Sequence, residues 1–255
     1  MFADIRNFIT IRWDKTEIEP PPPWIKDCSK SLDKHVEIHE KLFVQFAKQI
    51  RVIYPKATLH VITNKPLKDK DKLIFHKMDV PSNHLAKLHM YGLIDEPAMY
   101  IDTDVIIISK FLEKHIDVSG PFNYYKSGGE RNDLHTHAKK DLPVQIKHLY
   151  NAGLVWVASP SPKIVEDMQC LHEEYFHSKE VEERIGFQIG DEHSASLYSA
   201  INNIKFHQFD EVNVLRRHVT DMQHCQTVHY TGYDLKHKEQ CLEEFKTHSL
   251  AHRII

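Results

Sequence analysis

The sequence predicts an α/β domain in which helices flank a mixed, mostly parallel sheet. Two observations predict this class. Apolar, β-branched runs alternate along the chain with stretches of helical periodicity, and 41% of the 255 residues are apolar, which is enough for a substantial core. Alternating strands and helices are typical of parallel sheets, because the connection between two parallel strands must cross the sheet. No internal repeat or linker is evident, so we expect a single domain over residues 1–255.

The first half of the chain supplies most of the expected elements. An apolar face that recurs from Val36 to Tyr54 predicts a helix over 33–54, and a second, shorter helix is expected over 82–94. The proline-rich stretch 17–29 is expected to be extended, because proline fixes φ and lacks a donor. β-branched and aromatic residues predict strands over 5–13, 57–64, 72–80 and 98–109.

The second half is less regular. Residues 148–159 read as one buried strand, and Ser161 with Pro162 predicts the start of a helix. A further helix is expected over 191–203, and 227–241 reads as a polar, histidine-containing end. Two adjacent glycines make 120–133 a long loop. We expect this loop to contact an acceptor, because aromatic faces stack on sugars or bases; its candidates are Phe122, Tyr124, Tyr125 and Arg131.

Charge and composition exclude several classes of protein. The net charge of -3 offers no general field for stable nucleic-acid or membrane binding. No stretch approaches roughly 18 uncharged apolar residues, and the N-terminus lacks a long apolar region. The cysteines are far apart, which fits reduced thiols in a cytoplasmic protein; they are Cys28, Cys170, Cys225 and Cys241. Neither a Rossmann glycine fingerprint nor a P-loop is present.

Histidine is abundant, with 20 residues, so a structural zinc site is an alternative to weigh. No spacing among them repeats a known zinc pattern, and scattered histidines are mostly solvated or satisfied in the core. The groupings considered are His35 with His39, His135 with His137, and His218, His224 and His229.

Asp102 and Asp104 are the most informative residues, because they lie between the apolar runs "AMYI" and "VIII". The same spacing at Asp69 and Asp71 falls in a lysine-rich run and indicates only a solvent-exposed surface. Unpaired carboxylates near a buried strand cost several kcal/mol, which a divalent cation or hydrogen-bond donors would offset. Residues i and i+2 of a strand share a face, so both can address one ligand at the strand's carboxyl end. Pairing with a lysine, or capping of the next helix, is an equally weighted alternative.

Four ordered stretches then resemble the glycogenin-like glycosyltransferases, family 8 of the GT-A fold. They are "AKLHMYGLIDEPAMYIDTDVII", "YNAGLVWVASPS", "GDEHSASLYSAINNIKFHQFDEVNV" and "HYTGYDLK", and they span about 82–236. The resemblance implies one GT-A, Rossmann-like domain. Residues 1–110 would form a nucleotide-binding half ending in the Asp-x-Asp motif, and 111–255 an acceptor-binding half with a C-terminal metal and phosphate clamp.

The resemblance also implies roles for particular residues. Asp102, Asp104 and His229 would bind Mn²⁺ or Mg²⁺, and Asp102 would also contact the ribose or sugar. Asn151 and Asp191 would be the catalytic residues that hold sugar hydroxyls on the acceptor side. The diphosphate would be held by Lys87, Gly232 and Lys236. The chain departs from the family by one extra residue between Gly232 and Lys236, and by His237-Lys238 in place of Pro-Trp.

The function implied is a metal-dependent, retaining hexosyltransferase that uses a nucleoside-diphosphate sugar, with a UDP-sugar as the expected donor. The acceptor is open between a glycan, a protein, a lipid-linked sugar and a modified nucleobase. The alternatives are a noncatalytic GT-A-like binding protein and a metal-dependent phosphohydrolase. If the acidic pair holds a metal, replacing Asp102 or Asp104 by Asn is expected to abolish turnover and to leave the fold intact or more stable, because repulsion is relieved.

Overall fold

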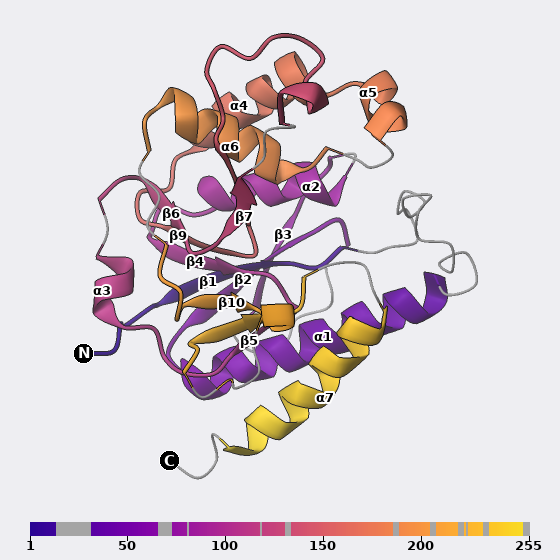
Figure 1. Cartoon of the computed structure of the whole chain (residues 1–255). Coiled ribbons are helices and arrows are strands. Elements are labelled where there is room, and N and C mark those ends of the chain that lie inside the picture. Colours follow the sequence, from indigo (N-terminus) through magenta and orange to yellow (C-terminus); the bar gives the residue numbers. More distant parts are fainter. Residues whose placement is uncertain are drawn as a thin grey trace.

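A six-stranded mixed sheet lies at the centre of the molecule (Figure 1), with strand order β3-β2-β1-β4-β9-β6. The computed structural model describes residues 1–13, 32–65, 73–80, 82–117, 119–130, 134–185, 189–204, 208–218, 222, 224–231 and 235–251. The strands are β1 (Asn7–Ile11), β2 (Thr58–Thr63), β3 (Leu73–Lys77), β4 (Ala98–Ile101), β6 (Phe122–Tyr124) and β9 (Leu154–Val157). The first four strands pair in parallel, whereas β9 is antiparallel to β4 and β6. The predicted mostly parallel, mixed sheet is confirmed.

Two smaller sheets adjoin this centre. One has the order β10-β11-β5 and is formed by β10 (Asn213–Leu215), β11 (Thr227–His229) and β5 (Val105–Ile107). The other pairs β7 (Ser127–Glu130) with β8 (His148–Tyr150). The sheet that contains β5 and β11 brings together residues that are far apart in the sequence.

Helices form a layer on each side of the central sheet (Figure 1). On one side α1 (Leu32–Ile53) packs beside α7 (Leu235–Ala251). On the other lie α2 (Asn83–Lys87), α4 (Pro162–Leu171), α5 (Lys179–Ile185) and α6 (Asp191–Ile201). Short helical segments complete the fold: α3 (Glu113–Ile116), a π-helical segment at His172–Phe176, and single 3₁₀ turns at Leu88–Tyr91, Leu134–His137 and Arg216–His218.

Two hydrophobic clusters explain why the central strands read as continuous apolar runs. Phe8 packs in the cluster that contains α1 and α7, whereas its neighbour Ile9 packs in the cluster that contains α4. Successive residues of a strand point to opposite faces, so a strand covered on both faces needs apolar residues at every position. In α1 the buried residues recur at intervals of three and four; they are Ile38, Leu42, Phe46, Ile50 and Ile53.

Three sequence predictions need correction. The single strand expected over 98–109 is two strands, β4 and β5, which belong to different sheets. The strand expected over 148–159 is likewise two, β8 and β9. The long loop expected over 120–133 contains β6 and β7. In the first two cases apolar residues flank a break of only three residues, at 102–104 and 151–153, so periodicity alone does not reveal it.

The polar C-terminal end also differs from expectation, because α7 begins at Leu235. Cys241 and Phe245 are fully buried in the cluster shared with α1. The proline-rich stretch 17–29, the Asp69–Asp71 run and Gly232 lie outside the described residues. Among the helices that the structure does describe, none is both long enough and apolar enough to cross a membrane.

Candidate active site

Asp102 and Asp104 project from a turn between β4 and β5, rather than from one face of a continuous strand as expected. The turn is held by the backbone: Asp102 N donates to Gly153 O at 2.9 Å and Val105 N donates to Asp102 O at 3.1 Å. The two carboxylates nevertheless address a common space. One ligand atom from each, together with a ring nitrogen of His229, can be chosen so that all lie within 4.8 Å of one another.

His229 reaches the acidic pair because β11 pairs antiparallel with β5, which places His229 opposite Val105. Its Nε2 lies 3.4 Å from Asp104 Oδ1, and its side chain is 3% exposed. Its Nδ1 is buried with no hydrogen-bond partner among the described residues. Gly153 leaves the space for the ring, since a Cβ there would lie 2.1 Å from His229 Cε1.

These residues fit a divalent cation. Two carboxylates and one imidazole are oxygen and nitrogen donors of the kind that Mn²⁺ and Mg²⁺ accept, and the orphaned Nδ1 shows that the imidazole is not fully satisfied by the protein. Within the described parts of the chain, no other group of three or more histidine, cysteine, aspartate or glutamate side chains has this geometry.

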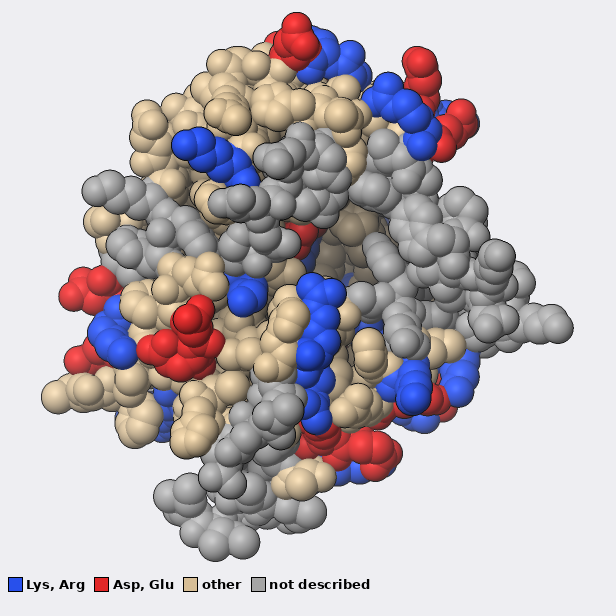
Figure 2. All heavy atoms as spheres, in the orientation of Figure 1, with Lys and Arg blue, Asp and Glu red and all other residues tan. Residues whose placement is uncertain are grey.

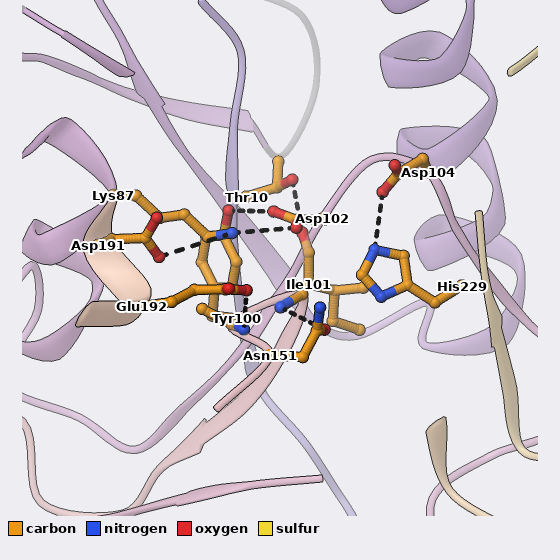
Figure 3. Close-up of polar contacts among 12 residues, drawn as sticks. Thr10, Lys87, Tyr100, Ile101, Asp102, Asp104, Asn151, Asp191, Glu192 and His229 are labelled. Carbon is orange, nitrogen blue, oxygen red and sulfur yellow. Dashed lines mark hydrogen bonds and ion pairs between the residues drawn. The ribbon is translucent and has the colours of Figure 1, made fainter. Parts of the chain in front are cut away.

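Lys87 links Asp102 to α6 (Figure 3). It lies at the end of α2, and its Nζ donates to Asp102 Oδ2 at 3.0 Å and lies 3.9 Å from Asp191 Oδ2. Tyr100 donates its hydroxyl to the other oxygen, Asp102 Oδ1, at 2.5 Å. His84 Nδ1 lies 3.4 Å from Asp191 Oδ1. A lysine thus holds the first aspartate of the pair and an acidic residue of α6 together.

The charges around these groups shift their pKa values. Burial favours the neutral form of Asp104, but the nearby Lys238 and His229 outweigh it and hold the pKa of this carboxyl well below its usual range. Burial likewise opposes the charge of Lys87, yet Asp102 and Asp191 together raise its pKa. The pKa of Asp191 is lowered against the effect of burial by Lys87 and His84. All three groups are therefore charged at neutral pH.

Asn151 has a structural part in the same region. Its backbone N donates to Lys126 O at 2.9 Å, and its side-chain Oδ1 accepts a hydrogen bond from Gly153 N at 3.1 Å. Asn151 therefore shapes the turn that presents Gly153 to His229. The side-chain oxygen of Asn151 is thus engaged in a local turn, which is a common role of asparagine.

One cavity of about 480 Å³ brings most of the predicted residues together. Figure 3 shows Lys87 and Asp191 on one side of Asp102, and His229 with Asp104 on the other. On the face drawn in Figure 2 the surface is hollowed near its middle, with acidic and basic atoms beside one another. The predicted residues that line the cavity are Lys87, Asp102, Asp104, Asn151, Asp191 and His229.

Lys236 differs from the other predicted residues, because it is exposed at the start of α7 and does not line the cavity. Lys238, two residues later, does. Its Nζ is hydrogen-bonded to Asp104 Oδ2 and donates to Tyr230 O at 2.7 Å. The only sequence signal for Lys238 was the departure from the family pattern at His237-Lys238. That departure did not indicate where the side chain of Lys238 points.

Glu192 is a second residue that sequence reasoning missed. It lines the cavity beside Asp191, and its Oε1 accepts a hydrogen bond from Ala152 N at 3.0 Å. Burial and the neighbouring charge of Asp191 raise its pKa to about 7. Its position next to Asp191 was the only signal available in the sequence.

The aromatic residues expected to contact an acceptor are in the core instead. Phe122, Tyr124 and Tyr125 are at most 2% exposed, and Tyr124 shares a hydrogen bond with Tyr91. Phe122 and Tyr124 belong to strand β6, and all three residues pack in the hydrophobic clusters of the core rather than in a loop. Arg131 lies outside the described residues.

Comparison with known proteins bears on the fold. No family model matches the sequence of this chain, and no curated protein sequence does so either. Solved structures do match. WbbM, a bifunctional glycosyltransferase, has a TM-score of 0.53 and 9% identity over 97% of this chain. A glycosyltransferase involved in glycosylation of the major capsid of PBCV-1 has a TM-score of 0.50 and 11% identity over 94%. GlyE of Streptococcus pneumoniae TIGR4 has a TM-score of 0.51 and 12% identity over 96%.

The chain covers 52% of WbbM and 64% of GlyE, but 99% of the capsid glycosyltransferase. At these identities the likeness establishes the fold alone. The protein therefore has the α/β fold of the GT-A glycosyltransferases, with a mixed, mostly parallel sheet flanked by helices. Membership of the glycogenin-like family stays a prediction, because no sequence match supports it.

Proposed function

We propose that this protein is a metal-dependent, retaining glycosyltransferase that moves a hexose from a UDP-sugar to an acceptor. The observation that carries the proposal is the convergence, in one cavity of a GT-A-like fold, of an acidic pair, a histidine and the lysine Lys87. The acceptor belongs to one of the classes that the sequence left open: a glycan, a protein, a lipid-linked sugar or a modified nucleobase.

In this proposal Asp102, Asp104 and His229 hold Mn²⁺ or Mg²⁺. When bound, such an ion neutralises the negative charge that a diphosphate leaving group gains as the glycosidic bond breaks. Asp102 is kept in position by Lys87 and the Tyr100 hydroxyl, which occupy one oxygen each. A carboxylate fixed in this way loses little conformational freedom when it engages a ligand.

The remaining residues are proposed to hold the donor and acceptor. Lys87 contributes positive charge near the diphosphate, and Asp191 and Asn151 orient sugar hydroxyls. Support for Asp191 is that its Oδ2 is buried without a hydrogen-bond partner among the described residues, so a hydroxyl donor would satisfy it. Support for Asn151 is its place on the cavity wall beside Gly153. Gly232, outside the described residues, is proposed to allow close backbone approach to the phosphates.

One observation favours a second candidate function. Each aspartate of the pair already has a lysine partner, Lys87 for Asp102 and Lys238 for Asp104. An acidic pair neutralised in this way can be purely structural, and the protein would then be a noncatalytic GT-A-like module that binds nucleotide sugars. The lysine pairing weighed from the sequence alone is thus present, and it is compatible with either function.

A single experiment separates these functions. The protein is incubated with a panel of sugar nucleotides and Mn²⁺, and released nucleotide and sugar are measured. We expect slow release of UDP from one UDP-sugar, because many transferases hydrolyse their donor when no acceptor is present. Binding without release would favour the noncatalytic module. Release of sugar phosphate with nucleoside monophosphate would instead indicate a phosphohydrolase.

A further inference from the structure

Lys238 has its ammonium group inside the proposed metal site. Its side chain is 5% exposed and forms an ion pair with Asp104 Oδ2. Besides this carboxylate, its Nζ contacts the carbonyl oxygen of Tyr230, at 2.7 Å. The other oxygen, Asp104 Oδ1, faces His229 Nε2 at 3.4 Å. Both oxygens of Asp104 therefore already have a partner from the protein.

The position of Lys238 is fixed by a helix. Cys241, three residues later on α7, is fully buried with its Sγ 3.6 Å from Asp104 O. Lys34 of α1 pairs with Glu239 at 2.6 Å, and Phe245 packs in the cluster that α7 shares with α1. Residues 238, 241 and 245 lie on one helical face. The base of the lysine side chain is thus held firmly, and only its four-carbon stem can redirect the ammonium group.

From this geometry we propose that Lys238 is an internal cation that competes with the divalent ion for Asp104, and that a nucleoside diphosphate relieves the competition by accepting the ammonium group. The inference rests on the proposed function, because it assumes that the cavity takes a metal and a diphosphate. It differs from the resemblance, which implies Lys87 and Lys236 as the lysines at the diphosphate and gives no role to Lys238.

The expected consequence is that metal and nucleotide bind cooperatively. Without nucleotide, an entering cation must displace the ammonium from Asp104 and leave it buried with only the Tyr230 carbonyl as a partner, which is unfavourable. A diphosphate supplies anionic oxygens that form charge-assisted hydrogen bonds with the displaced ammonium. Each ligand then strengthens the binding of the other by the same factor.

The test measures Mn²⁺ binding to the full chain by electron paramagnetic resonance, and UDP binding by calorimetry at saturating Mn²⁺. In Lys238→Met we expect Mn²⁺ affinity without nucleotide to rise about tenfold, because the competing charge is gone, and UDP affinity to fall about tenfold. The matched control is Lys246→Met, which removes the same charge from an exposed position of the same helix. It should change neither affinity.

A second variant covers the case in which Lys238→Met does not fold, as judged by circular dichroism. Lys238→Gln removes the charge and keeps a donor for the Tyr230 carbonyl, and it should show the same two opposite shifts. Unchanged Mn²⁺ affinity without nucleotide in the folded variant would overturn the competition, even if the parent binds Mn²⁺ with UDP. A parent protein that binds neither Mn²⁺ nor UDP would overturn the proposed function itself, so the two failures are distinguishable.

Discussion

At the scale of single residues, Glu192 gives the cavity a carboxyl whose pKa is far from its ordinary value. Burial raises this pKa from 4.5 to about 7, and the charge of Asp191 adds to the effect. Between these two pH values the unfolded chain has lost the proton while the folded protein keeps it. The folded state therefore binds more protons, and the free energy of unfolding contributed by this group falls as pH rises across that window.

We expect Glu192→Gln to flatten this dependence. Gln keeps the acceptor for Ala152 N but cannot ionise, so at pH 8 the variant should be more stable than the parent by on the order of 2–3 kcal/mol, and near pH 4.5 equally stable. The measurement is urea unfolding at several pH values. Glu183→Gln, at an exposed position of α5, is the control and should follow the parent at every pH. Parallel curves for Glu192→Gln and the parent would contradict the assignment.

The contacts of Asp104 change the expected effect of its replacement on stability. Relief of repulsion was expected to leave Asp104→Asn as stable as the parent or more so. The structure instead pairs this carboxylate with the buried Lys238, and its lowered pKa shows that attraction exceeds repulsion. Asp104→Asn should therefore lose on the order of 3 kcal/mol of unfolding free energy, because the buried ammonium of Lys238 then has no anionic partner.

A double-mutant cycle checks this prediction. Adding Lys238→Met to Asp104→Asn removes the stranded charge, so most of the lost stability should return. Asp95→Asn, in an exposed turn, is the control and should change stability by less than about 0.5 kcal/mol. If Asp104→Asn unfolds at the same urea concentration as the parent, the ion pair contributes nothing to stability.

At the scale of elements, the site depends on a close approach between the start of β9 and β11. A Cβ on Gly153 would lie 2.1 Å from His229 Cε1 and 2.7 Å from Nδ1, so Gly153→Ala must displace the ring. We expect Mn²⁺ affinity measured in the presence of UDP to fall about 10–100-fold, as for the loss of groups that orient metal ligands. Calorimetry measures the loss, and circular dichroism checks that the fold is kept.

Gly120→Ala is a control of the opposite kind. Gly120 has a φ of +112°, which is unfavourable for alanine, but no heavy atom lies within 4 Å of a Cβ placed there. This variant should lose about 1–2 kcal/mol of stability and keep its Mn²⁺ and UDP affinities. If both glycine variants weaken binding equally, the effect follows from general destabilisation and not from the ring of His229.

The elements also show what sequence can predict. Strands and helices with a marked apolar pattern were predicted at β1, β2, α1 and α4, because burial on one or both faces fixes the period. The turns at 102–104 and 151–153 were missed, since apolar residues flank each turn and hide the break. Helix α7 was missed because a buried lysine occupies its inner face at 238, where an apolar residue would have completed the pattern.

Six of the residues that the motifs singled out line one cavity, whereas Lys236 does not and Gly232 lies outside the described residues. Lys238 and the role of Gly153 depend on which elements meet in space, and no local pattern in the sequence carries that information. The side chain of Lys238 is buried because it shares the inner face of α7 with Cys241 and Phe245. Sequence reasoning therefore singled out Lys236 in this segment and gave no indication that Lys238, two residues later, lines the cavity.

At the scale of the whole molecule, the two expected halves share one sheet. Strands β1 to β4 come from residues before 110, whereas β6 and β9 come from later in the chain; β9 pairs with β4, and β6 pairs with β9. Neither half can complete the central sheet alone. We therefore expect a single cooperative unfolding transition, with coincident curves from tryptophan fluorescence and far-UV circular dichroism. Two separated transitions would mean that the halves are independent folding units.

The proposed metal site depends on the rotation of helix α7 about its axis, because this rotation places Lys238. Lys238 reaches Asp104 only while it stays in register with Cys241 and Phe245, whose burial fixes the rotation of the helix. Inserting one alanine between Lys238 and Cys241 would turn the ammonium by about 100° around the helix axis relative to Cys241 without altering the net charge of the chain. Two sequences of nearly identical composition could therefore share this fold and differ in whether a lysine ammonium contacts Asp104.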